Sequence, residues 1–484
     1  MSADGSLPAP PRTAPHNLDA EQGLLGAILY DNETFNRIGD RLRPQHFYDP
    51  VHGRIFEVCV NMISRGKLAD GVTLREHFTR EAALAEIGGA AYLLTLVQNA
   101  AKLISHAQEY AEIIYDLALR RELIRIGEDI AREAATPIVN ESGVAQIEEA
   151  ERSLFTLAQS GGASKGFDDF SVALAISIEM TAAAYETKAG ISGIATGLAD
   201  LDRQLGGLHP SDLVILAGRP SMGKTALAAN IAFNVARARV HSVREGKTGK
   251  DAAGGVVGFF SLEMSAEQLA TRLLSEFAEI ESSRIRRGEI QKHEYEKLKD
   301  AAAELQAIPL HIDETGGISI AALQARARRL QRTHGLDLIV VDYLQLVTAS
   351  NRRSEGRVQE VSEITQGLKA LAKDLKVPVI ALSQLSRQVE LRDDKRPQLS
   401  DLRESGSIEQ DADVVLFVYR EEYYLARQEP KLNTPEHVAW QTELDSIRNK
   451  AEVIVGKQRH GPIGKVDLIF DNRFTKFSSV ARGS

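Results

Sequence analysis

Short apolar segments alternate with helix-like segments through the second half of this chain. The apolar segments are DLVILAG (212–218), GVVGFFSLE (255–263), LDLIVVDYLQLV (336–347), VPVIALSQL (377–385), ADVVLFVY (412–419) and AEVIVGKQR (451–459). Near-continuous apolar strands separated by helices are typical of a mainly parallel sheet that is covered on both faces. We therefore predict an α/β fold for residues 191–484.

The first half of the chain has a helical pattern instead. Asn17 can cap a helix whose apolar face holds Leu24, Leu25, Ile28 and Leu29. A later stretch continues the helical spacing with Ile113, Leu117, Leu123 and Ile126. Residues 17–155 are therefore predicted to form an all-α domain that binds partners or itself.

The remaining segments divide the chain further. Residues 1–16 read as a flexible tail and 156–190 as a linker that contains a helix over 170–190. The polar, Gly-rich stretch 241–255 predicts a loop. Residues 421–450 form a polar connection longer than an ordinary loop, so we expect it to be partly helical.

Composition limits the class of protein. The 484 residues suffice for two or three domains, and no apolar run approaches the ~18 residues that cross a bilayer. A single cysteine, Cys59, excludes an internal disulfide and favours the reducing cytoplasm. The net charge of −9 argues against a protein coated in positive charge, but a local basic patch can still bind nucleic acid.

A phosphate-binding motif follows the first apolar segment. GRPSMGKT is a complete G-x-x-x-x-G-K-[ST] between a strand and an amphipathic helix. Glycine lets the backbone N–H groups wrap around phosphates, and a lysine ammonium pairs with the β- and γ-phosphates. The threonine hydroxyl can ligate Mg²⁺. The sequence thus predicts an ATP and Mg²⁺ site at Gly218, Arg219, Pro220, Ser221, Met222, Gly223, Lys224 and Thr225.

Three polar side chains stand at or near the ends of other apolar segments. Asp342 follows LIVV and can organise Mg²⁺, although it could instead cap a turn. Glu263 can accept a proton from an attacking water or simply open the next helix. Gln384 can sense the γ-phosphate, or be an ordinary strand end. Beside a P-loop the pattern favours the Mg²⁺ role for Asp342, leaves both interpretations of Glu263 open, and by itself favours an ordinary strand end for Gln384.

Two further groups suggest contacts beyond the nucleotide. Lys457 and Arg459 lie on one face of a strand, where they could be a solvated edge or an arginine finger offered to a neighbouring subunit. Arg403 and Gly406 lie in a predicted loop that could grip a phosphodiester backbone or be plain surface. The basic segment 326–332 could add to a DNA-facing charge or be a solvated helix face.

Taken in order, these motifs resemble one family, the DnaB-type replicative DNA helicases. The resemblance is carried by GRPSMGKT, FFSLEMS, VVDYLQL, ALSQLSR, DLRESGSIEQDADVV, GKQRHGPIG and the N-terminal PHNLDAEQGLLGAIL. It covers nearly the whole chain from about residue 15. The segments 241–255 and 421–450 look longer than is usual in the family.

The resemblance implies a RecA-like ATPase domain and a homohexameric ring around one DNA strand. Nucleotide would lie between subunits, with Glu263 activating water, Lys224, Thr225, Asp342 and Gln384 around the phosphates, and Arg459 and Lys457 supplied by the next subunit. Arg403, Glu404 and Gly406 would contact single-stranded DNA. The helical domain would form a collar that takes part in binding primase, and a loader would place the ring on DNA.

Two other functions are compatible with a P-loop domain of this kind. A recombinase-like strand-exchange ATPase could share the fold, but the helical N-terminal half and KQRHGPIG argue against it. An ATP-switched ring scaffold or loader would need no unwinding. The combination of Glu263, Asp342, Gln384 and Arg459 favours a hydrolysing helicase over both.

Overall fold

The computed structural model describes most of the chain. The described residues are 13–38, 42–78, 90–98, 100, 104–136, 191–247, 252–349, 356–402 and 406–480, with scattered positions between 143 and 181. The chain divides into two compact units, residues 1–169 and 170–484, and each is described by itself. Within the described ranges, no helix has the length and apolar character to cross a membrane.

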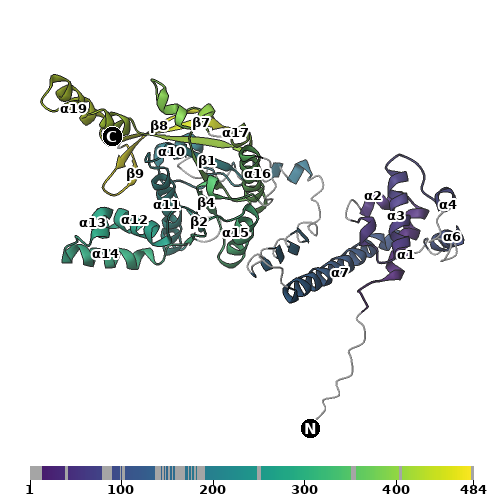
Figure 1. Ribbon diagram of the computed structural model, residues 1–484. Coiled ribbons are helices and arrows are strands. Elements are labelled where there is room, and N and C mark those ends of the chain that lie inside the picture. The colour runs from purple at the N-terminus through teal and green to yellow at the C-terminus, as the bar shows by residue number, and fades with distance from the viewer. Residues whose placement is uncertain are drawn as a thin grey trace, which may run out of the picture. The chain divides into compact units, whose positions relative to one another are not determined.

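The first unit is built from helices, as predicted (Figure 1). Their bounds are α1 (Leu18–Tyr30), α2 (Glu33–Ile38), α3 (Pro50–Ile63), α4 (Thr73–Phe78), α6 (Ala90–Gln98) and α7 (Ala107–Ala135). The Asn17 side chain caps α1 by accepting a 3.0 Å hydrogen bond from the Ala20 amide. Leu24, Leu25 and Ile28 are fully buried, so the predicted core face of α1 is confirmed.

The predicted core face of α7 is partly wrong. Ile126 is buried and Leu117 half-buried, but Ile113 and Leu123 are 39% and 49% exposed. The core of this unit takes its α7 contacts from Ala107, Ala111 and Ile114, which are spaced by four and three residues. The helix has 29 residues, and among the described residues the core cluster of this unit takes α7 side chains only from its first part, up to Tyr115.

The second unit contains one nine-stranded sheet with the order β3-β2-β4-β5-β1-β6-β7-β8-β9. The strands are β1 (Leu213–Gly218), β2 (Val257–Ser261), β3 (Leu310–Asp313), β4 (Leu338–Asp342), β5 (Val379–Gln384), β6 (Val414–Tyr419), β7 (Lys450–Gln458), β8 (Gly464–Asp471) and β9 (Lys476–Ser479). Strands β1 to β6 are parallel, and β7 to β9 are antiparallel.

All six predicted strands are present, but three others were missed. Strand β3 has four residues, all of them half-buried, which gives little apolar signal. Strand β8 buries every second residue, at Val466, Leu468 and Phe470. Such alternation is typical of a sheet with one covered face, whereas the prediction rested on continuous apolar runs.

Helices cover both faces of this sheet (Figure 1). The helices described in this unit are α10 (Ala199–Leu205), α11 (Lys224–Arg244), α12 (Ala266–Ala278), α13 (Ser282–Arg287), α14 (Lys292–Leu305), α15 (Ile320–His334), α16 (Arg357–Leu375), α17 (Gly406–Asp411), α18 (Glu421–Leu425) and α19 (Pro435–Ile447). Val214 and Leu216 of β1 pack with α11, whereas Leu213, Ile215 and Ala217 pack with α15 and α16. Strand β1 is thus buried on both faces.

The predicted connections agree with the structure in part. Residues 421–450 are partly helical, as expected, through α18 and α19, and α19 projects from the sheet in Figure 1. The loop predicted at 241–255 is shorter, because α11 continues to Arg244. Much of the predicted linker, 156–190, lies outside the described residues, although the described positions between 170 and 181 are helical.

Candidate nucleotide site

The loop between β1 and α11 is tightly folded around its glycines. Gly223 has φ +96°, a conformation that side chains disfavour, and a Cβ there would lie 3.0 Å from a ring carbon of Phe477. At Gly218 a Cβ would lie 3.2 Å from the carbonyl oxygen of Val418. A residue larger than glycine would therefore disturb the loop at both positions. With glycine at both, the loop backbone can lie close to a bound group.

Lys224 begins α11 and points back over the loop. Its Nζ donates hydrogen bonds to the carbonyl oxygens of Gly218 (2.8 Å) and Arg219 (3.3 Å). Burial lowers the pKa of Lys224 to about 8, against the opposing charges of Asp342 and Glu263. The ammonium is therefore largely protonated at neutral pH but is not neutralised by a carboxylate within hydrogen-bonding distance among the described contacts.

Asp342 ends β4, beside Ser261 of β2, and is 2% exposed. Burial raises the pKa of its carboxyl, while a hydrogen bond from the Thr225 hydroxyl and the charges of Lys224 and Arg272 lower it. Its Oδ2 is buried with no hydrogen-bond partner among the described residues. A carboxylate and a hydroxyl that face each other, with one oxygen unsatisfied, are a donor set that suits Mg²⁺.

Glu263 and Gln384 reach the same end of the sheet. Glu263 lies two residues beyond β2, is exposed, and acts electrostatically on Lys224 and Asp342. Gln384 is the last residue of β5 and is paired in register with Gly218. The structure therefore brings these five predicted residues together at the carboxyl ends of the parallel strands.

The side chain of Arg219 has a different role from a phosphate contact. Its Nε donates to Glu390 Oε1 at 2.9 Å, and its Nη1 donates to the Leu385 carbonyl at 3.0 Å. The residue is 7% exposed. The side chain of Arg219 thus connects the phosphate-binding loop to the segment after β5. A phosphate would contact the backbone of Arg219 and not its side chain.

Sequence reasoning missed Arg272, on α12. Its charge acts on Asp342, and its Nη1 is buried with no hydrogen-bond partner among the described residues. Burial lowers the pKa of this guanidinium, against the charge of Asp342. The signal was weak, because an arginine within the helical segment SAEQLATRLL looks like any solvated helix position.

Lys457 and Arg459 lie at the other end of the sheet. Lys457 Nζ donates to the carbonyl oxygens of Glu409 (2.5 Å) and Ala412 (2.8 Å). Arg459 Nη1 pairs with Asp413 Oδ1 at 2.9 Å, next to the start of β1. The P-loop follows the end of β1, about 17 Å away at 3.3 Å per residue. The two cations are therefore separated from Lys224 of their own chain.

The predicted DNA loop is described only in part. Arg403 and Glu404 lie outside the described residues. Gly406, expected in a loop, is the first residue of α17 instead, so that expectation was wrong for this position. In the basic segment 326–332, Arg326 pairs with Asp313 and Arg328 with Asp374, which is what a solvated helix face would do.

The sheet order, the glycine loop and the strand-end Asp342 define a P-loop ATPase domain of RecA-like architecture. The DnaB-like helicase C terminal domain matches residues 193–479, and the DnaB-like helicase N terminal domain matches residues 13–116. The chain therefore belongs to the DnaB-like replicative helicases.

Full-length relatives agree with this assignment. The replicative DNA helicase DnaB of Rickettsia typhi is 46% identical over 473 residues, covering 98% of this chain and 94% of the relative. That of Geobacillus stearothermophilus is 40% identical, covering 97% and 96%. A solved DnaB-like replicative helicase, described with its interactions with primase, has a TM-score of 0.68 at 30% identity and covers 96% of this chain and all of its own.

These findings confirm the helicase interpretation of the sequence. The chain is an ATP-dependent replicative DNA helicase with a helical N-terminal domain and a RecA-like C-terminal domain. The scaffold and recombinase alternatives are not supported by these relatives.

Proposed function

We propose that six copies of this chain form a ring that moves along one DNA strand and excludes the other, with ATP hydrolysed between neighbouring copies. The observation that carries the proposal is the position of Arg459. It is held beside Asp413 at the amino end of β1, whereas Lys224 lies beyond the carboxyl end. A finger that cannot reach its own nucleotide is suited to the nucleotide of a neighbour.

Within one copy, the loop Gly218–Thr225 would hold the triphosphate through its backbone N–H groups and the Lys224 ammonium. Thr225 and Asp342 would hold Mg²⁺, which supplies charge neutralisation at the phosphate oxygens when bound. The unsatisfied Oδ2 of Asp342 supports this assignment. Arg272 would keep the Asp342 carboxyl ionised by its nearby positive charge.

Glu263 would accept a proton from the attacking water. Its exposure and its electrostatic coupling to Lys224 suit a base that faces the γ-phosphate. Gln384, in register with Gly218, would hydrogen-bond the γ-phosphate and register its loss. Arg459, with Lys457 beside it, would stabilise the charge that develops on the phosphate of the neighbouring copy.

The DNA contact would be the segment that contains Arg403, Glu404 and Gly406. This segment leads into α17, whose first residue is Gly406 and whose Glu409 carbonyl accepts a hydrogen bond from Lys457 Nζ, so the proposed DNA contact and the proposed finger belong to adjoining segments. The helical domain, residues 17–155, would form the collar, joined by the linker 156–190 to the ATPase domain 191–484. The related helicase described with primase suggests primase as a partner. A helicase loader and a cytoplasmic location complete the proposal.

The deciding experiment measures ATP hydrolysis with and without single-stranded DNA, together with unwinding of a forked duplex. We expect unwinding that needs ATP, Mg²⁺ and a free single-stranded tail. Particle mass measured on the same sample should correspond to six chains. A monomer that unwinds at full rate, or a ring that unwinds blunt duplex without a tail, would contradict the proposal.

A further inference from the structure

Asp413 is a buried hub at the amino end of the sheet. It is 1% exposed and lies directly before β6. Its Oδ2 accepts hydrogen bonds from the Leu213 amide (2.8 Å) and from Lys369 Nζ, while its own amide donates to the Leu213 carbonyl (3.0 Å). This carboxylate is therefore fixed in place by β1 on one side and by α16 on the other.

The remaining acceptors of Asp413 hold Arg459. Oδ1 accepts from Arg459 Nη1 at 2.9 Å, and the Asp413 carbonyl accepts from the Arg459 amide at 2.9 Å. Arg459 is thus held both at its backbone and at its tip, yet its side chain is 50% exposed. A guanidinium has five N–H donors, so a single ion pair leaves most of them free to face a ligand.

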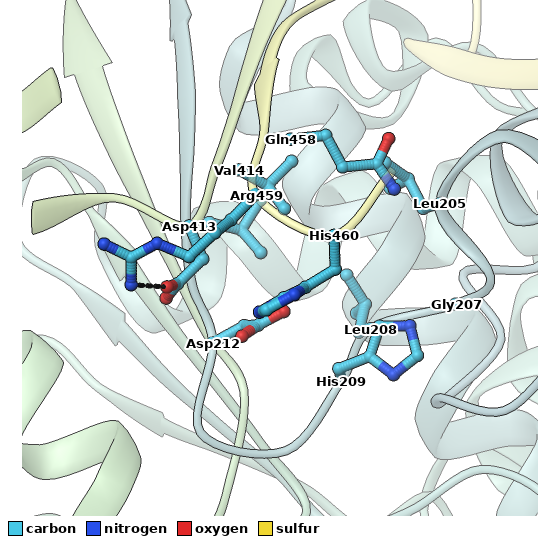
Figure 2. A pocket seen from close by; sticks show the side chains of 11 residues that line it. Leu205, Gly207, Leu208, His209, Asp212, Asp413, Val414, Gln458, Arg459 and His460 are labelled. Carbon is cyan, nitrogen blue, oxygen red and sulfur yellow. Dashed lines mark hydrogen bonds and ion pairs between the residues drawn. The ribbon is translucent and has the colours of Figure 1, made fainter. Parts of the chain in front are cut away.

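Figure 2 shows this arrangement in the small cavity that Asp413 and Arg459 line with Asp212, His209 and His460. The Arg459 guanidinium meets Asp413, and the Asp212 carboxylate lies beside the ring of His460 instead. Burial and the charge of Asp413 raise the pKa of Asp212, while the charges of Lys369, His209 and His460 lower it. The cavity therefore contains a second carboxylate that does not hold the finger.

We propose that Asp413 is a positioning residue for catalysis: it aims the Arg459 guanidinium out of its own subunit and toward the nucleotide of the neighbour. The inference rests on the proposed function of Arg459 as a finger supplied between subunits. A free arginine side chain loses rotamer entropy when it binds. A finger already held at both ends loses less, and charge stabilisation depends on such preorganisation.

Asp413→Asn is the test variant, because asparagine keeps the size of the side chain and an acceptor for the Leu213 amide. In homogeneous rings we expect kcat for ATP to fall of the order of 10- to 100-fold, with KM changed far less, since a misplaced group of this kind costs about that much. Asp212→Asn, in the same cavity, is the matched control and should stay within about twofold.

Mixed rings separate positioning from a structural role. A Glu263→Ala chain has a defective site of its own but an intact finger. If Asp413 acts on the neighbour's site, mixing Asp413→Asn chains with Glu263→Ala chains restores hydrolysis above the sum of the two separate preparations. A variant damaged in its own site would show no such recovery, so that result would overturn the proposal.

The same mixture made with Arg459→Ala chains tests the finger role of Arg459 separately from the positioning role of Asp413. Recovery with Arg459→Ala but not with Asp413→Asn rejects the positioning role and leaves the finger standing. No recovery with either variant rejects the finger between subunits, and the positioning role with it. If Asp413→Asn chains do not assemble, Asp413→Glu replaces them, because it keeps the charge beside Lys369 and displaces the guanidinium. The expected and the overturning results are unchanged.

Discussion

The hydroxyl of Thr225, in the first turn of α11, hydrogen-bonds the carboxylate of Asp342 at the end of β4. The pair joins the phosphate-binding loop to a strand two places away in the sheet. The second carboxylate oxygen, Oδ2, is buried without a partner among the described residues. This carboxylate oxygen is therefore available to bind a cation.

This pair predicts the response to Mg²⁺. Asp342→Asn removes the charge but not the volume, so hydrolysis should need at least about tenfold more Mg²⁺ for half-maximal rate, and saturated kcat should fall. Titrating Mg²⁺ at fixed ATP measures both quantities. Asp337→Asn, at the residue directly before β4, is the control. An unchanged Mg²⁺ requirement would remove Asp342 from the metal site.

Lys224 predicts loss of activity without loss of fold. Lys224→Ala removes the cation from the loop, and we expect hydrolysis to fall of the order of 100-fold or more, with no unwinding. Because Lys224 makes its described hydrogen bonds to two loop carbonyls and no ion pair, the melting temperature should change little. Lys247→Ala, an exposed lysine beyond the end of the same helix, is the control. Retained unwinding by Lys224→Ala would contradict the site.

The pKa of Lys224 predicts proton uptake on nucleotide binding. Burial lowers this pKa to about 8, and a bound phosphate would raise it again. Binding should therefore take up a proton between about pH 8 and 10, and affinity should decline as pH rises through 8. Calorimetry in two buffers of different ionisation enthalpy measures the uptake. Lys224→Arg should show none, since arginine stays protonated.

The same shift has a defined effect on stability. Between about pH 8 and the ordinary lysine value of 10.5, the unfolded chain binds more protons at this position than the folded chain. The contribution of Lys224 to the free energy of unfolding therefore rises with pH in that window. The fraction of molecules that carries the charge needed for nucleotide falls over the same range.

Glu276 is a buried acid on α12 that the mechanism does not use. It is 4% exposed and accepts a hydrogen bond from Asn230, whose Oδ1 accepts from the Phe477 amide at 2.7 Å. Burial raises the pKa of Glu276 to about 7, against the charges of Lys476 and Arg237. The ring of Phe477 packs near Gly223, so the hydrogen bonds from Glu276 through Asn230 to Phe477 help to hold the phosphate-binding loop in place.

Glu276→Gln should stabilise the protein at alkaline pH. The folded chain binds more protons here than the unfolded chain between about pH 4.5 and 7, so the stability that Glu276 contributes is lost as pH rises through 7. Glutamine keeps a hydrogen bond and removes the buried charge, for a gain of about 3 kcal/mol at pH 8 that shrinks toward pH 5. Thermal melts at the two pH values measure it. An equal effect at both would reject the shifted pKa.

Much of the site could be predicted because parallel strands end at a common edge. Lys224, Asp342 and Gln384 follow apolar runs, and a residue at the carboxyl end of one parallel strand necessarily lies near the others. Arg272 could not be predicted, since its position depends on how α12 packs against α11. Strands β3 and β8 were missed for a related reason: a half-covered strand has a weak apolar signal.

The sequence by itself determined the phosphate-binding loop, the residues at the strand ends and the family. Tertiary structure decided where Arg459, the proposed finger, lies. Lys457 and Arg459 come at the end of a strand, like Asp342, but β7 runs antiparallel to β6, with Gln458 beside Val414. An antiparallel strand has its carboxyl end on the side of the sheet where the parallel strands begin. Arg459 is therefore held by Asp413 and faces away from its own nucleotide site, a relationship that strand direction alone creates.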